Sequence, residues 1–192
     1  MSLRVSVSPW AMIAGGLLFY LSDGRTLRLL LPAVLAHELG HLALAFLLGR
    51  RLLSFRIEIS GLCLQYAGAA EPRQDAVIAA AGPVAGLLYA LAVRRLGADG
   101  ALSAGISLLL AMFNILPAEP LDGGHISCAL FGAQRAKRIS KLTSLAVLVI
   151  GLYCLFRGRG AALFLAGCFL LLADRPAADR VSSKARTDRR CV

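Results

Sequence analysis

The stretch LPAVLAHELGHLALAFLLG, residues 31–49, decides how the rest of the chain is interpreted. It is an apolar, helix-like run that carries His37, Glu38 and His41 in its middle. A titratable side chain at bilayer depth is costly unless it is paired, ligated or hydrated. A soluble helix would continue a polar face beyond these residues, but residues 42–48 are wholly apolar. The sequence therefore predicts that the three side chains lie inside a membrane and that another part of the chain supplies their partner.

The composition extends this interpretation to the whole chain. Of the 192 residues, 58% are hydrophobic, and the mean hydropathy of +0.71 is far from that of a soluble domain. Apolar runs that predict membrane spans occur at 8–21, 27–48, 76–93, 101–117, 142–156 and 160–173. We expect an all-α integral membrane protein with about six transmembrane helices, forming one membrane-embedded domain over residues 1–173 with a core at 27–130.

The basic residues predict the orientation of these spans. The formal net charge is +10. If the N-terminus is cytoplasmic, fifteen Lys and Arg residues lie on the cytoplasmic side and six on the outer side, as the positive-inside rule requires. We therefore expect a multi-pass protein of a bacterial cell membrane with both termini in the cytoplasm, and a basic, disordered tail at 174–192 that lies against lipid headgroups. No nucleic-acid-binding motif accompanies the charge, so nucleic acid is not an expected partner.

The H-E-x-x-H pattern predicts a zinc site. His37 and His41 are four residues apart and share one face of a helix. Two imidazoles so placed can hold one Zn²⁺, with Glu38 beside the activated water as the proton acceptor. A catalytic zinc site has three protein ligands, so the pair needs one more.

The segment FNILPAEPLDGGHI, residues 113–126, offers that third ligand. Asp122 is the candidate, since prolines and glycines around it break the helix, and broken helices at bilayer depth occur where they line a cavity or pack on protein. Glu119 and His125 are alternatives as ligands. In another interpretation, the segment is a cytoplasmic turn in which Asp122 only caps the next helix. The amide of Asn114 could bond the backbone of a substrate.

These two motifs together resemble the site-2 protease family of intramembrane zinc metalloproteases (peptidase M50). The six-span layout is most similar to the branch of stage IV sporulation protein FB. The resemblance implies one Zn²⁺ per chain held by His37, His41 and Asp122, Glu38 as the catalytic base, and substrate binding by Asn114, Pro120 and Gly123. It also implies hydrolysis of peptide bonds in membrane-embedded or membrane-tethered proteins, and it leaves room for a regulatory membrane protein as a partner.

Two further segments bear on substrate handling and packing. SFRIEIS, residues 54–60, alternates with period two, and LCLQY follows a Ser-Gly turn, so we expect a small β-hairpin after the second helix. Its edge could pair with an unwound substrate by strand addition, although a plain connecting hairpin is the alternative. Gly82 and Gly86 form a G-x-x-x-G pattern that predicts close approach to the helix of His37.

The function predicted from the sequence is that of an intramembrane zinc metalloendopeptidase. Two other classes remain as alternatives. A catalytically silent scaffold that binds transmembrane helices would not need Glu38. A metal or proton transporter would place ionisable groups along several helices, whereas here they gather on two.

Overall fold

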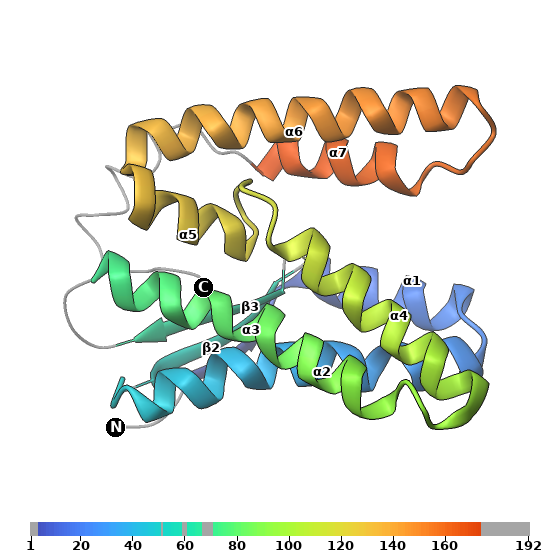
Figure 1. Ribbon diagram of the computed structural model, residues 1–192, viewed down its shortest axis with the longest axis horizontal. Helices are drawn as coiled ribbons and strands as arrows, with labels where there is room; N and C mark the ends of the chain where they lie inside the picture. Colours follow the sequence, from blue (N-terminus) through green and yellow to red (C-terminus); the bar gives the residue numbers. More distant parts are fainter. Residues whose placement is uncertain (1–3, 51, 59–60, 67–70, 174–192) are drawn as a thin grey trace.

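The structure is a computed structural model that describes residues 4–50, 52–58, 61–66 and 71–173 (Figure 1). Within these residues the chain forms seven helices and a three-stranded sheet. In chain order the elements are β1 (Arg4–Val7), α1 (Pro9–Leu21), α2 (Gly24–Leu47), β2 (Leu52–Glu58), β3 (Gly61–Tyr66), α3 (Pro72–Val93), α4 (Gly97–Asn114), α5 (Asp122–Phe131), α6 (Ala133–Phe156) and α7 (Ala162–Ala173).

Helices α2, α3 and α4 pack on one another and form the centre of the fold (Figure 1). Small and hydroxyl-bearing side chains lie at their contacts. The hydroxyl of Ser107 on α4 donates to the carbonyl of Gly86 on α3 at 2.8 Å, and that of Ser103 donates to the carbonyl of Leu29 on α2 at 2.9 Å. In an apolar solvent, helices associate through close packing and such hydrogen bonds, because lipid tails give no hydrophobic driving force between helices.

The burial pattern is the reverse of that of a water-soluble helix. On α2, the buried face consists of Ala33, His37, His41 and Ala45, whereas Leu35, Leu39 and Phe46 are 57%, 57% and 80% exposed. Small and polar residues thus face the protein, and large apolar residues face outward. This is the pattern expected when the surrounding solvent is lipid.

In the part of the chain that the structure describes, four helices are long and apolar enough to cross a membrane: α2, α3, α4 and α6. Helix α7 is apolar but shorter, and α1 has 13 residues. Each sequence-predicted run corresponds to a helix, but the run 101–117 extends beyond the end of α4 at Asn114, and α6 begins at Ala133, well before its apolar part. The short helix α5 contains no apolar run of spanning length, so it was not among the spans predicted from the sequence.

The small sheet lies where the sequence predicts a hairpin. Strands β2 and β3 are antiparallel neighbours, and residues 59–60 between them lie outside the described residues. Strand β1 pairs with β2 in parallel, so the order is β1-β2-β3. One edge of β2 is therefore already covered by the start of the chain, which the sequence did not predict.

Helices α6 and α7 pack side by side along one side of the molecule, and α5 contacts both α3 and α6 (Figure 1). Glycines make the α6–α7 contact close, since a Cβ on Gly151 would lie 2.5 Å from the backbone nitrogen of Phe164. The loop 115–121 and α5 thus lie between the α2–α4 centre and the α6–α7 pair.

We predict that Gly40→Ala destabilises the fold. A Cβ at this position would lie 2.5 Å from the carbonyl oxygen of Ala81 on α3, and backbone cannot move aside cheaply. Forcing extra volume into a close contact costs about 1–3 kcal/mol. Thermal unfolding of the purified protein in detergent should show a lower midpoint.

Gly105→Ala on α4 is the matched control, because a Cβ there meets nothing within 4 Å. It should leave the midpoint unchanged or raise it slightly, since alanine is the better helix former. Equal midpoints for the two variants would contradict the close approach of α2 and α3.

Candidate metal centre

The two histidines of α2 occupy its buried face at the contact with α3. His37 and His41 are 4% and 3% exposed. Their Nε2 atoms lie 3.3 Å apart, and the rings meet edge to face at an interplanar angle of 83°. The spacing of four residues therefore brings two imidazole nitrogens to one point, as the sequence predicts.

Asp122 brings a carboxylate to the same point from a different part of the chain. Its Oδ2 lies 3.2 Å from Nε2 of His37 and 3.5 Å from Nε2 of His41. Asp122 is the first residue of α5, and no side-chain hydrogen bond caps this helix. The interpretation of Asp122 as a mere helix cap is therefore wrong. The N-terminal end of a helix is, in addition, favourable for a negative charge.

The spacing of these three atoms fits a zinc ion. A tetrahedral zinc with bonds of about 2.0–2.1 Å separates neighbouring ligand atoms by about 3.3–3.4 Å. The three observed separations are 3.3, 3.2 and 3.5 Å. Oδ2 of Asp122 is buried and accepts no hydrogen bond within the described residues. A buried carboxylate oxygen without a donor is costly, and a cation between the three atoms would satisfy it. Two imidazoles and one carboxylate are a donor set that zinc accepts.

Helix α3 orients the ring of His41. Nδ1 of His41 lies 2.8 Å from the carbonyl oxygen of Ile78, which requires a hydrogen on Nδ1 and leaves Nε2 of the neutral ring with its lone pair free for a metal. Gly82 gives the ring its space, because a Cβ there would lie 2.2 Å from Nε2. No feature of the sequence predicts the contact of His41 with the Ile78 carbonyl. The G-x-x-x-G pattern predicts only a close approach of two helices, whereas Gly82 lies directly against the ring of His41.

The glycines after Asp122 have a packing role. A Cβ on Gly123 would lie 2.1 Å from the carbonyl oxygen of Ile115, and one on Gly124 would lie 2.8 Å from that of Ala118. The loop 115–121 is therefore pressed against the first turn of α5, and only glycine fits at these two positions. The L-D-G-G run allows the chain to turn sharply and still direct the Asp122 carboxylate at the histidines.

Glu38 and Asn114 complete the surroundings of the cluster. Glu38 is half-buried on α2 between the two histidines in sequence. Asn114 ends α4, and its Nδ2 lies 3.4 Å from Nε2 of His37. Asn114 is thus next to the donor cluster, and its predicted role in binding the substrate backbone remains a prediction.

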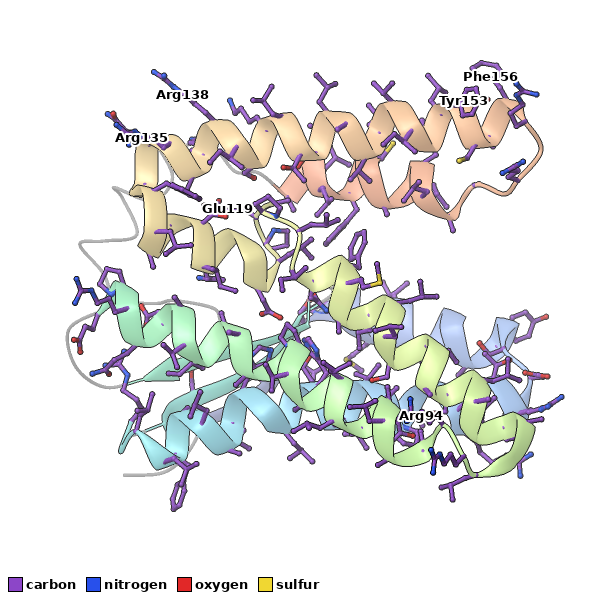
Figure 2. All side chains as sticks on the ribbon, in the orientation of Figure 1. Arg94, Glu119, Arg135, Arg138, Tyr153 and Phe156 are labelled. Atoms are coloured by element: carbon purple, nitrogen blue, oxygen red, sulfur yellow. The ribbon has the colours of Figure 1, made fainter. Side chains whose placement is uncertain are left out.

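The other ligand candidates from the sequence are not part of the donor cluster. Among the described residues, the group of His, Cys, Asp and Glu side chains that could hold a metal consists of His37, His41 and Asp122. Glu119 and His125, the alternatives for the third ligand, do not belong to it. Glu119 lies in the loop 115–121, on its α6 side (Figure 2), and is joined to Pro120 by a cis peptide bond. A role of Pro120 or Gly123 in substrate binding remains a prediction.

Comparison with protein families identifies the class of protein. Residues 10–118 match the family Peptidase M50B-like, and residues 100–157 match Peptidase family M50. The first match covers more than half of the chain and contains His37, Glu38, His41 and Asn114. The chain therefore belongs to the peptidase M50 family, the family of the site-2 proteases, as the two motifs predicted.

Individual relatives agree with this assignment. The chain is 28% identical to Rip3 of Mycobacterium tuberculosis over 93% of its own length and 50% of that protein. It is 29% identical to stage IV sporulation protein FB of Bacillus subtilis over 80% of its length and 58% of that protein. The chain thus spans about half the length of these relatives, and the two identities are too similar to favour one branch of the family.

A solved structure shows the same fold. The site-2 protease from Methanocaldococcus jannaschii superposes with a TM-score of 0.65 at 18% sequence identity, over 91% of each chain. At this identity the likeness speaks for the fold alone.

We predict that Asp122→Asn weakens zinc binding by at least about 100-fold. A neutral amide is a poorer ligand for zinc than a carboxylate, and loss of a ligand costs more than the 10- to 100-fold typical of groups that only orient a ligand. Zinc content after dialysis and titration with a zinc chelator measure the change. Asp99→Asn, which alters an exposed carboxylate paired with Arg25, should retain zinc. Full zinc content in Asp122→Asn would exclude Asp122 as a ligand.

We also predict that Gly82→Ala abolishes zinc binding although no ligand is changed. The new methyl group would occupy the place of the His41 ring and force Nε2 away from Asp122. Gly86→Ala is the matched control on the same helix, since its Cβ would meet the hydroxyl of Ser107 at 3.3 Å. If both variants bind zinc equally, the ring of His41 is not held against α3.

Proposed function

We propose that this chain is an intramembrane zinc endopeptidase that cleaves membrane-embedded or membrane-tethered proteins. The observation that carries the proposal is the buried triangle of His37 Nε2, His41 Nε2 and Asp122 Oδ2, with sides of 3.3, 3.2 and 3.5 Å. Membership of the peptidase M50 family supports it. The relative Rip3 carries the words zinc metalloprotease in its name.

Each residue of the site has a separate role in the proposed reaction. His37, His41 and Asp122 would hold one zinc ion, which supplies Lewis-acid polarisation of a peptide carbonyl and of water. Glu38 takes the proton from the attacking water and returns it to the amine that leaves. The Asn114 side chain, next to His37, holds the backbone of the substrate beside the ion. Pro120 and Gly123 shape the wall against which that backbone lies.

We further propose six membrane spans within a domain of residues 1–173, with both termini in the cytoplasm of a bacterial cell. Helices α2, α3, α4 and α6 support four of these spans, and the apolar α1 and α7 would be the two short ones. Arg135 and Arg138 lie at one end of α6, whereas Tyr153 and Phe156 lie at its other end (Figure 2). Cations on the cytoplasmic side and aromatic side chains at the opposite interface fit this orientation. The basic tail, residues 174–192, lies outside the described residues, and its attraction to anionic headgroups stays a prediction.

The sheet is the proposed place of substrate entry. In the order β1-β2-β3, the strand β3 pairs with β2 alone among the strands that the structure describes, so its other edge can pair with an extended chain. A transmembrane helix must unwind before hydrolysis, because its peptide groups are shielded by their own hydrogen bonds. Pairing with β3 would replace the hydrogen bonds that the substrate loses. A regulatory membrane protein could act by covering this edge.

We predict that Glu38→Gln abolishes peptide cleavage but leaves zinc bound. Glutamine has a similar shape but cannot take a proton, and the three ligand atoms stay unchanged. Loss of a general base lowers rates by about 100- to 10,000-fold. The measurement compares cells that produce wild type or variant, by mass spectrometry of new N-termini within membrane-protein spans, together with the zinc content of each purified protein.

Glu71→Gln provides the matched control, because Glu71 is exposed at the start of α3 and makes no side-chain cap bond. It should yield the same new N-termini as wild type, and chelation of zinc should remove them. New N-termini at wild-type levels in Glu38→Gln would refute the proposed mechanism. Zinc binding without any cleavage product, even in wild type, would instead favour a membrane scaffold.

A further inference from the structure

Helix α6 reaches the metal-binding segment through one buried hydroxyl. Ser140 is 1% exposed, and its Oγ accepts a hydrogen bond of 2.9 Å from the backbone N–H of Glu119. Glu119 lies three residues before Asp122 in the loop 115–121. The hydrogen bond therefore connects α6 with the loop that delivers the third ligand.

Displacement of this loop must move Asp122. The carbonyl oxygens of Ile115 and Ala118 lie where a Cβ on Gly123 or Gly124 would be, at 2.1 and 2.8 Å. The loop also has an internal hydrogen bond, in which the Leu121 N–H donates to the carbonyl of Ala118 at 2.8 Å. Loop and first helical turn thus form one tightly packed unit, and a shift at Glu119 is passed to the carboxylate.

Apolar contacts also join α6 and α7 to this unit. Ala118 and Leu121 pack in one buried cluster with Val147 of α6 and Leu170 of α7. Apolar contacts hold surfaces together without directing them, whereas a hydrogen bond weakens steeply when its angle or length changes. The Ser140 bond thus adds the directional restraint that the apolar cluster lacks.

Ser144 shows that a buried hydroxyl on this face of α6 is not by itself evidence of such a role. It lies one turn after Ser140 and is 0% exposed. Within the described residues its Oγ has no hydrogen-bond partner. The two serines are therefore about equally buried on one helix face, but among the described residues only Ser140 is hydrogen-bonded to the loop 115–121.

We propose that Ser140 is a positioning residue for Asp122, which sets the zinc affinity of the site by holding the loop 115–121 through Glu119 N–H. This inference rests on the proposed zinc site. Its consequence is that the metal affinity depends on a helix that contributes no ligand. A displacement of α6 relative to α5 would weaken only the contact of the ion with Asp122. His37 and His41 would keep their positions, because both belong to α2.

The test compares Ser140→Ala with Ser144→Ala in the full chain in detergent micelles, using zinc alone as the probe. Titration against a chromogenic zinc chelator should show affinity about tenfold weaker for Ser140→Ala, a change of about 1.4 kcal/mol. Ser144→Ala should remain within about twofold of wild type, since it removes a hydroxyl without a partner. At limiting zinc, Ser140→Ala should lose kcat with KM unchanged, and excess zinc should restore kcat. A loss that excess zinc does not restore, or equal zinc affinities of the two variants, overturns the proposal.

Hydrogen exchange keeps the proposal falsifiable if Ser140→Ala does not fold. In wild type and in Ser144→Ala, the Glu119 amide should exchange as slowly as amides inside α5. Exchange at the rate of an exposed loop amide overturns the proposal. The outcomes also separate the two levels of inference. Weaker zinc binding by Ser140→Ala in a protein that cleaves nothing upholds the positioning role and refutes the peptidase. If Ser140→Ala and Ser144→Ala bind zinc equally while Glu38→Gln alone abolishes cleavage, the positioning role of Ser140 is refuted and the peptidase is upheld.

Discussion

Three atoms that bear lone pairs meet within 3.5 Å of one another in a buried site, and this close meeting is the constraint on which the fold depends. The atoms are Nε2 of His37, Nε2 of His41 and Oδ2 of Asp122. Hydrogen bonds among them cannot satisfy all three, because the hydrogen of His41 is used on the carbonyl of Ile78. A cation satisfies all three at once. The three atoms can meet in this way only because α2, α3 and α5 approach one another closely.

Small residues make this approach possible. Gly40 and Gly82 remove the two Cβ atoms that would otherwise separate α2 from α3 at the level of the histidines, and Gly123 and Gly124 do the same for α5 against its loop. Each glycine costs backbone entropy in a helix. The cost is offset because helices in lipid gain from close packing, and the hydroxyls of Ser103 and Ser107 add hydrogen bonds between them. The same glycines therefore serve the fold and the site.

The sequence allowed prediction of the parts of the site that are local. The His37–His41 pair depends on helix periodicity alone, and the membrane setting follows from the unbroken apolar run after it. Asp122 could be proposed because a two-histidine site lacks a ligand, but Glu119 and His125 remained alternatives. Choosing among them needs the path of the loop 115–121, which depends on contacts with α5 and α6. The Ile78 carbonyl could not be predicted, since every residue has one and only packing selects which carbonyl faces His41. The pairing of β1 with β2 was unpredictable for the same reason.

The three donor atoms belong to two parts of the molecule that are held in different ways. His37 and His41 lie within α2, whose position is determined by packing in the α2–α4 centre. Asp122 lies on the short α5, which contacts α3 on one side and α6 on the other. An ion bound by all three residues would therefore join the α2–α4 centre to the segment held by α6 and α7. Binding that requires the folded arrangement adds its free energy to the stability of that arrangement. Zinc would thus hold together the two parts of the molecule that supply the three donor atoms.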